Sequence, residues 1–130
     1  MIILALRTDK PEAEIGLFDD KKRLAYEKWQ ADRQLAETIH KRIEKILDLL
    51  SISLSDINGI VVYKGSGSFT GLRIGHSVAN ALSYAQKIPV VARAGENWLD
   101  NGIKDLLAGR NDKIVAPEYG AAAKTTSPKK

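Results

Sequence analysis

The feature that most constrains the fold is a glycine-rich segment that joins a β-branched run to an apolar helical pattern. Residues 64–75 read KGSGSFTGLRIG, with four glycines and two serines, and they follow GIVVY at residues 59–63. β-Branched residues favour a strand, and glycines favour a tight turn. A strand, a tight turn and a helix in this order predict a βα unit, in which helices cover a sheet with parallel strands.

The residues before this unit predict three strands and a helix. Short apolar or alternating runs at residues 2–7, 13–19 and 23–29 are separated by turn-like TDKPE and DDKK, which predicts a meander. Apolar residues then recur every three or four positions, which predicts a helix over about residues 33–50 with Asp32 as its N-cap.

The residues after the glycine segment extend the same pattern. We expect a helix from about Thr70 to Gln86, a strand at 88–93, and a shorter helix in ENWLDNGIKDLL that Gly102 interrupts. KIVAP, residues 113–117, has the character of a last short strand. The predicted order is β-β-β-α-β-α-β-α, an α/β fold with a mixed sheet covered by helices.

Length and composition fit one small globular domain, since the chain has 130 residues of which 44% are hydrophobic. There is no cysteine, so disulfides and thiol catalysis are excluded.

Three of the four net positive charges lie in the last ten residues, at Lys124, Lys129 and Lys130, which leaves residues 1–120 nearly neutral. We expect residues 121–130 to be a disordered tail, whose alternative role is weak, salt-dependent contact with RNA. The first apolar run is too short for a leader or a membrane span, so we expect a cytoplasmic protein.

The glycine segment does not fit the known phosphate or nucleophile motifs. A P-loop and a dinucleotide fingerprint each need a glycine where Thr70 stands, and neither Ser66 nor Ser68 has the flanking glycines of a nucleophile elbow. His40 and His76 have no metal-ligand spacing around them and are interpreted as surface or interface residues, so we predict neither catalytic nor metal-binding residues and no cofactor. A generic anion site at the start of the helix remains an alternative. Its loop would comprise Ser66, Gly67, Ser68, Thr70 and Arg73.

The helix after the loop carries a stripe of small residues. Gly71, Gly75 and Ala79 recur every four residues, and such a stripe lets another helix, from the same chain or a partner, approach closely. We favour a partner, because the two longest helices carry more apolar surface than one thin sheet needs. On this hypothesis a Gly75→Leu substitution abolishes pairing without unfolding the monomer. The predicted interface comprises Gly71, Leu72, Gly75, Val78, Ala79 and Leu82.

The segment GSGSFTGLRIG closely resembles the hallmark Gly-Pro-Gly-Ser-Phe-Thr-Gly-Leu-Arg-Ile-Gly of the TsaB (YeaZ) family, with Ser66 in place of the usual proline. ILALRTD resembles the family's opening strand, and IPVV resembles the strand after its glycine helix. The resemblance covers about residues 1–95 and implies a single half-domain of the actin-like, RNase H-like ASKHA superfamily.

The resemblance also implies a function. TsaB-like proteins are non-catalytic scaffolds that pair with TsaD, which transfers a threonylcarbamoyl group to the adenosine next to the anticodon of tRNA, with TsaE as an accessory ATPase. They also form homodimers, and they contact tRNA only indirectly. The alternative from another class is a small phosphate- or nucleotide-binding enzyme that uses the glycine loop.

Two departures from the family pattern shape these expectations. Arg7 stands where the family commonly has an aspartate at the end of the first strand, and a cation there argues against a Mg²⁺–ATP site. The chain is also short, so we expect residues 1–95 to form the family's first half and residues 96–120 to be a remnant of the second half that ends in the family-like PEYG.

Overall fold

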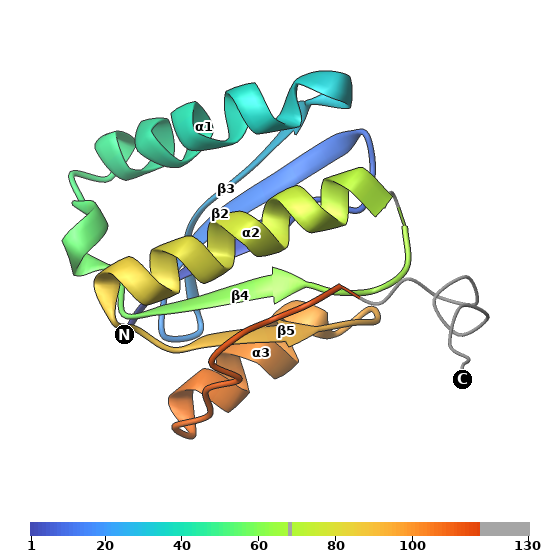
Figure 1. Ribbon diagram of the computed structural model, residues 1–130. Coiled ribbons are helices and arrows are strands. Elements are labelled where there is room, and N and C mark those ends of the chain that lie inside the picture. The colour runs from blue at the N-terminus through green and yellow to red at the C-terminus, as the bar shows by residue number, and fades with distance from the viewer. Residues whose placement is uncertain (68, 118–130) are drawn as a thin grey trace, which may run out of the picture.

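A computed structural model describes residues 1–67 and 69–117 of the chain (Figure 1). The predicted order of three strands, helix, strand, helix, strand and helix is confirmed. The strands are β1 (Ile2–Arg7), β2 (Glu12–Asp19), β3 (Lys22–Gln30), β4 (Gly59–Tyr63) and β5 (Val90–Arg93). The helices are α1 (Leu35–Leu49), α2 (Phe69–Gln86) and α3 (Trp98–Leu107), with 3₁₀ turns at Asp32–Gln34 and Leu54–Asp56.

The five strands form one mixed sheet in the order β3-β2-β1-β4-β5. The meander makes antiparallel pairs, with β2 between β1 and β3. The two βα crossovers then place β4 parallel to β1 and β5 parallel to β4. The carboxyl ends of β1 and β4 therefore meet at one edge of the sheet, where the glycine loop begins.

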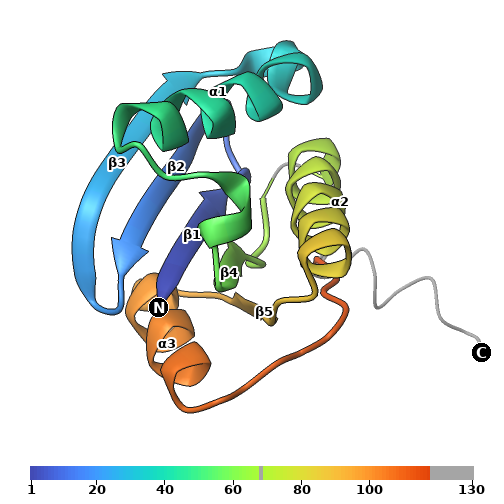
Figure 2. The ribbon, with the colours of Figure 1, turned by 90° about the vertical axis from the view of Figure 1, so that its left-hand side faces the viewer.

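The sheet separates two hydrophobic layers. Figure 2 shows helices on both faces of the sheet. The helices α1 and α2 cover one face, and α3 covers the other under β4 and β5. Side chains of β1 alternate between the layers, because successive residues of a strand point to opposite faces. Leu4 and Leu6 pack under α1 and α2, whereas Ile3 and Ala5 pack toward α3.

The start of α1 differs from the prediction, since Asp32 is not its N-cap. The backbone N–H groups of Ala31 and Asp32 both donate to the carbonyl of Pro11, at 2.9 and 3.1 Å. Asp32 takes a positive φ of 48° and opens a 3₁₀ turn, and its carboxylate accepts a bond from the Gln30 amide at 3.1 Å. Because these hydrogen bonds to Pro11 hold residues 31 and 32 outside the helix, the α-helix begins only at Leu35.

Two predictions near the C-terminus are also wrong. Gly102 does not interrupt α3, which is continuous, because this glycine lies against β4: a Cβ on it would lie 3.0 Å from Cγ2 of Val61. Residues 113–117 form no strand. Within this segment Val115 is bonded through its backbone to the side chain of Asn80 on α2. The two residues just before it, Asn111 and Asp112, accept bonds from β5 with their side chains.

Among the described helices, none has the length and apolar character needed to cross a membrane. The PEYG ending beyond Pro117 and the lysine tail lie outside the described residues, so the expectations for them are not examined by the structure. The α3 helix, which belongs to the predicted remnant at residues 96–120, packs directly on the sheet built by residues 1–95.

Candidate functional site on the glycine loop and the two-helix face

The glycine loop closes on the end of β1 rather than standing away from the protein. A Cβ on Gly67 would lie 2.6 Å from Cβ of Asp9 and 2.7 Å from its carbonyl oxygen. Gly67 has no positive φ. The glycine is therefore needed for space, because its backbone packs against the backbone of Asp9.

Charged and aromatic side chains line the base of this loop. Asp9 is 7% exposed, and its carboxylate accepts bonds from the guanidinium of Arg7 at 2.8 and 3.2 Å. The same guanidinium lies over the ring of Tyr63, 4.0 Å from its centroid. The hydrogen bond to Asp9 raises the pKa of Arg7. Arg7 thus contacts both a buried carboxylate and an aromatic ring.

The described residues of the predicted anion loop all lie at the surface. Ser66 and Gly67 are exposed, as are Thr70 and Arg73 on the first turn of α2. Ser68 lies outside the described residues. Anion binding here stays a prediction. The carboxylate of Asp9, beside Gly67, is paired with the guanidinium of Arg7. Within residues 1–67 and 69–117, no group of three His, Asp or Glu side chains is arranged to hold a metal ion.

The small-residue stripe of α2 faces the sheet of its own chain. Leu72 and Ala79 are completely buried, and Gly71, Gly75 and Val78 are buried as well. Leu82 is half-buried at the edge of the same core. Gly75 lets α2 approach Thr8, directly after β1, closely, which is the intrachain alternative for the stripe. The six residues predicted as an interface therefore pack against the core of their own chain. Direct contact of a partner with them stays a prediction.

The expectation that Gly75→Leu would leave the monomer folded is wrong. A Cβ on Gly75 would overlap Oγ1 of Thr8 and lie 3.2 Å from Cβ of Thr8. Thr8 is itself fully buried, so it has no room to withdraw. A leucine at this position would force α2 away from β1.

A valley runs between α1 and α2 on the outer side of these helices. One hollow of about 270 Å³ lies between Ile39 and His40 of α1 and Ser77 of α2. A second, of about 300 Å³, lies farther along between α1 and Leu82 and shares His40 with the first. A wider hollow of about 890 Å³ opens at the amino-terminal ends of both helices and shares Ile74 with the first.

The outward side of α2 completes this surface, and the sequence reasoning missed it. Arg73, Ser77, Ala81 and Tyr84 are exposed, and Tyr84 keeps 88% of its surface in water. The missed signal is helical periodicity: positions 73, 77, 81 and 84 recur every three or four residues opposite the small-residue stripe. A partner that seats on α2 meets these residues first. We call them, together with the valley, the two-helix face.

His76 is not a surface or interface histidine as expected, because it is 2% exposed. Its Nδ1 lies 2.8 Å from the carbonyl oxygen of Leu72, one turn back, and its Nε2 has no hydrogen-bond partner. Burial lowers the pKa of His76, and the nearby charge of Lys64 lowers it further against the opposing effect of the Leu72 carbonyl. His76 is therefore held neutral inside the helix–sheet layer.

Comparison with known proteins gives two groups of relatives. A protein-family model described as TsaD, tRNA N6-adenosine threonylcarbamoyltransferase, matches residues 29–92. The chain is 31% identical over 128 residues to the tRNA threonylcarbamoyladenosine biosynthesis protein TsaB of Escherichia coli, a match that covers 92% of this chain and 55% of that protein. It is also 36% identical over 81 residues to the tRNA N6-adenosine threonylcarbamoyltransferase of Geotalea uraniireducens, covering 62% of this chain and 23% of that protein. The chain thus spans little more than half the length of the curated TsaB relatives that it matches.

Solved structures give the same picture of the fold. YeaZ from Pseudomonas aeruginosa superposes with a TM-score of 0.67 and 28% identity, over 72% of this chain and 43% of that one. RuvC from Thermus thermophilus superposes with a TM-score of 0.52 over 95% of this chain and 89% of that one. At 11% identity the RuvC match concerns the fold alone. The mixed sheet with helices on both faces is the expected ASKHA-like fold.

Proposed function

Because the chain belongs to the TsaB (YeaZ) family over the region that it shares with these relatives, we propose that it takes part in forming N6-threonylcarbamoyladenosine in tRNA as a non-catalytic subunit. In this role it binds and supports a TsaD-type subunit, which carries out the transfer of the threonylcarbamoyl group. Contact with tRNA is indirect, through that subunit. A TsaE-type ATPase is the further partner of the assembled pair, and the chain alone forms a homodimer.

The observation that carries the proposal is the coincidence of the two-helix face with the region shared with TsaD. The TsaD family model matches residues 29–92, which include α1, β4 and α2. A partner built from the same elements presents a similar pair of helices, and two similar helix pairs pack against each other about an approximate two-fold axis. The valley at His40 is suited to receive a ridge of side chains from such a pair. The exposed Tyr84 is suited to pack against the partner's helices.

The non-catalytic role draws support from the end of β1 and from the glycine loop. Arg7 is tied to Asp9 and Tyr63, and Gly67 closes on the backbone of Asp9. The space that a nucleotide phosphate would need beside the loop is thus partly taken by the chain itself. The same contacts give the loop a structural role, as a tight connection between β4 and α2.

The proposal is tested by light scattering after gel filtration of the chain mixed with a TsaD-type subunit from the same organism. We expect one stable complex, with an interface that buries about 1,200–2,000 Å². An Ala81→Arg variant places a long cation in the middle of the two-helix face. Ala108→Arg is its control, because Ala108 is also exposed but lies at the end of α3 on the other face of the sheet. Ala81→Arg should abolish the complex and Ala108→Arg should retain it. Separate masses for the unmodified chain and TsaD, or equal effects of the two variants, would refute the proposal.

A further inference from the structure

The outer edge of β5 has its backbone polar groups filled by a neighbouring segment that is not a strand. The carbonyls of Pro89 and Arg93 accept bonds from the N–H groups of Ile60 and Lys64, so these residues face β4. Because backbone groups alternate along a strand, the N–H and C=O groups of Val90 and Ala92 point away from the sheet. An edge strand with such unpaired groups is a template for pairing with another chain.

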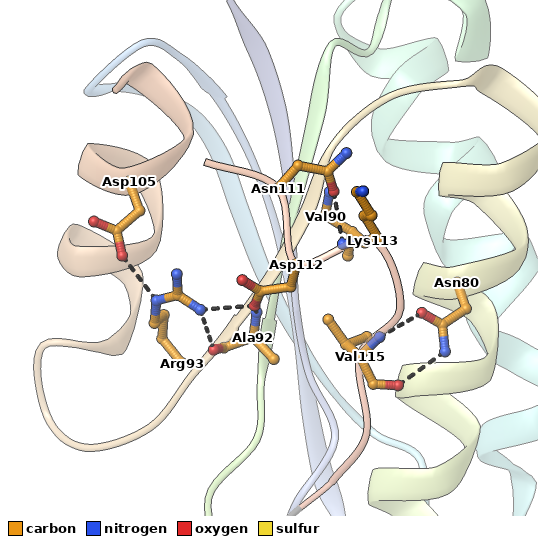
Figure 3. A network of polar contacts seen from close by, with 9 residues as sticks. All are labelled: Asn80, Val90, Ala92, Arg93, Asp105, Asn111, Asp112, Lys113 and Val115. Atoms are coloured by element: carbon orange, nitrogen blue, oxygen red, sulfur yellow. Dashed lines mark hydrogen bonds and ion pairs between the residues drawn. The ribbon is translucent and has the colours of Figure 1, made fainter. Parts of the chain in front are cut away.

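Residues 111–115, which we call the strap, satisfy this edge almost completely (Figure 3). The N–H of Val90 donates to Oδ1 of Asn111 at 3.2 Å, and its carbonyl accepts from the N–H of Asp112 at 2.9 Å. The N–H of Ala92 donates to Oδ2 of Asp112 at 3.0 Å. The remaining carbonyl, that of Ala92, accepts from the guanidinium of Arg93 at 2.6 Å. Four outward groups of β5 thus have four partners, three of them from the strap.

The strap is held in place at both of its ends. Asp112 pairs with Arg93 at 2.8 Å, and Arg93 in turn pairs with Asp105 of α3 at 2.8 Å. At the other end, the side chain of Asn80 on α2 bonds both the N–H and the carbonyl of Val115, at 2.9 and 3.0 Å. Val115 is buried in the core beneath α2. Burial alone would raise the pKa of Asp112, but the Ala92 N–H and the Arg93 guanidinium bring it below its ordinary value.

This arrangement differs from that of an added strand. A sixth strand would use its own backbone for all the bonds and would offer a new open edge beyond itself. The strap uses two side-chain oxygens instead, and its following residues turn inward to Asn80. It therefore ends the sheet.

We propose that the strap is an edge cap, which keeps β5 from pairing with β5 of a second copy of this chain. The second copy is the occupant because β5 offers the same outward groups, Val90 and Ala92, on both molecules, and two identical edges pair antiparallel about a two-fold axis. This inference does not depend on the proposed role in tRNA modification. It concerns the sheet edge, whereas that role concerns the two-helix face on α1 and α2.

The test opens the edge by removing the two side-chain oxygens in an Asn111→Ala/Asp112→Ala double variant. Amide hydrogen exchange followed by NMR should show the Val90 and Ala92 amides exchanging at least about tenfold faster, because each loses its acceptor. The Val91 and Arg93 amides, which face β4, should change far less. Light scattering of the concentrated double variant should give at least twice the mass of the unmodified chain.

Three further variants separate the edge cap from general loss of stability. Asp112→Asn keeps an oxygen for the Ala92 N–H and should leave both readouts near those of the unmodified chain. Asp100→Ala removes an exposed carboxylate from α3 away from the strap and should change neither. Asn80→Ala frees Val115 without touching β5, so it should speed exchange at Val90 and Ala92 even if the double variant does not fold.

Three results would overturn the proposal. The first is unchanged exchange at Val90 and Ala92 in both the double variant and Asn80→Ala, because the strap would then not protect the edge. The second is faster exchange at these amides with no gain in mass at any concentration, because the open edge would then take no second copy. Equal acceleration at all four β5 amides would also count against it, since that pattern indicates loosening of the whole sheet.

Discussion

Gly75 of α2 lies so close to Thr8, directly after β1, that any side chain at position 75 would overlap the Thr8 hydroxyl. Thr8 is fully buried, and its Oγ1 has no hydrogen-bond partner. The contact therefore depends on shape alone. It sets how closely α2 lies on the sheet, and with it the position of the two-helix face.

Gly75→Ala should lower the free energy of unfolding by about 1–2 kcal/mol, as measured by urea denaturation. Overpacking a filled site costs about 1–3 kcal/mol, and the better helix propensity of alanine returns about 1 kcal/mol at most. Adding Thr8→Ala should recover most of the loss, because the hydroxyl that it removes makes no hydrogen bond. Ser77→Ala on the exposed side of α2 is the control and should stay within about 0.5 kcal/mol of the unmodified chain. If the two substitutions at positions 8 and 75 are simply additive, the contact does not limit the approach of α2.

The buried carboxylate of Glu14 supplies a second prediction. Glu14 is 8% exposed on β2, and the hydroxyl of Tyr26 on β3 donates to its Oε1 at 2.5 Å. Burial, followed by the bond to Glu14, raises the pKa of Tyr26 well above its ordinary value, so the hydroxyl keeps its proton. Tyr26→Phe leaves the carboxylate oxygen without this donor and should cost about 1–3 kcal/mol in urea denaturation.

Tyr84→Phe is the matched control for Tyr26→Phe. Its side chain is almost fully exposed, so removing the hydroxyl should change the free energy of unfolding by less than about 0.5 kcal/mol. Equal effects of the two substitutions would mean that the Tyr26–Glu14 bond contributes nothing to stability.

Much of the fold could be predicted from the sequence, because most strands and helices are indicated by the pattern of apolar residues within their own segment. β1 and β4 have the predicted bounds, since each is a short apolar run ended by a change of residue type. The start of α1 could not be predicted in this way, because it depends on the carbonyl of Pro11, about twenty residues away. The strand predicted at residues 113–117 is wrong for a similar reason: the conformation there depends on the bonds between Val115 and Asn80, 35 positions apart.

The candidate site was harder to predict than the fold. Small residues at Gly71, Gly75 and Ala79 indicate that another element packs closely against α2, but their spacing does not show whether that element belongs to the same chain or to a partner. The structure gives the answer for the chain itself, which is β1 and the core. The direction of a helical stripe depends on where the sheet lies, and that is a tertiary property. For the glycine loop the same holds, since the need for Gly67 comes from Asp9, far away in sequence.

Nucleotide binding supplies a third prediction. Mg²⁺–ATP at 1 mM should shift the melting temperature by less than about 1 °C, because Gly67 closes on Asp9 and Arg7 occupies the end of β1. A ligand at about 100 times its Kd would add about 2.7 kcal/mol, which corresponds to a shift of several degrees. A large shift that disappears in an Arg73→Gln variant would instead support the alternative, an anion-binding loop.

The buried neutral His76 predicts a stability that falls with acidity. Its pKa is lowered in the folded chain, first by burial, from an ordinary value of about 6.5. Below that value the unfolded chain takes up a proton that the folded chain resists, so the stabilising effect is complete at neutral pH and is lost as the pH falls toward the folded-state pKa. The loss per pH unit is at most about 1.4 kcal/mol, and it should appear in urea denaturation between pH 7 and pH 5.

His76→Gln removes the titrating group and should flatten this part of the profile, whereas His40→Gln, on the exposed side of α1, should leave the profile as in the unmodified chain. If the His76→Gln profile remains as steep as that of the unmodified chain, other groups cause the acid loss and His76 is not held neutral by the fold.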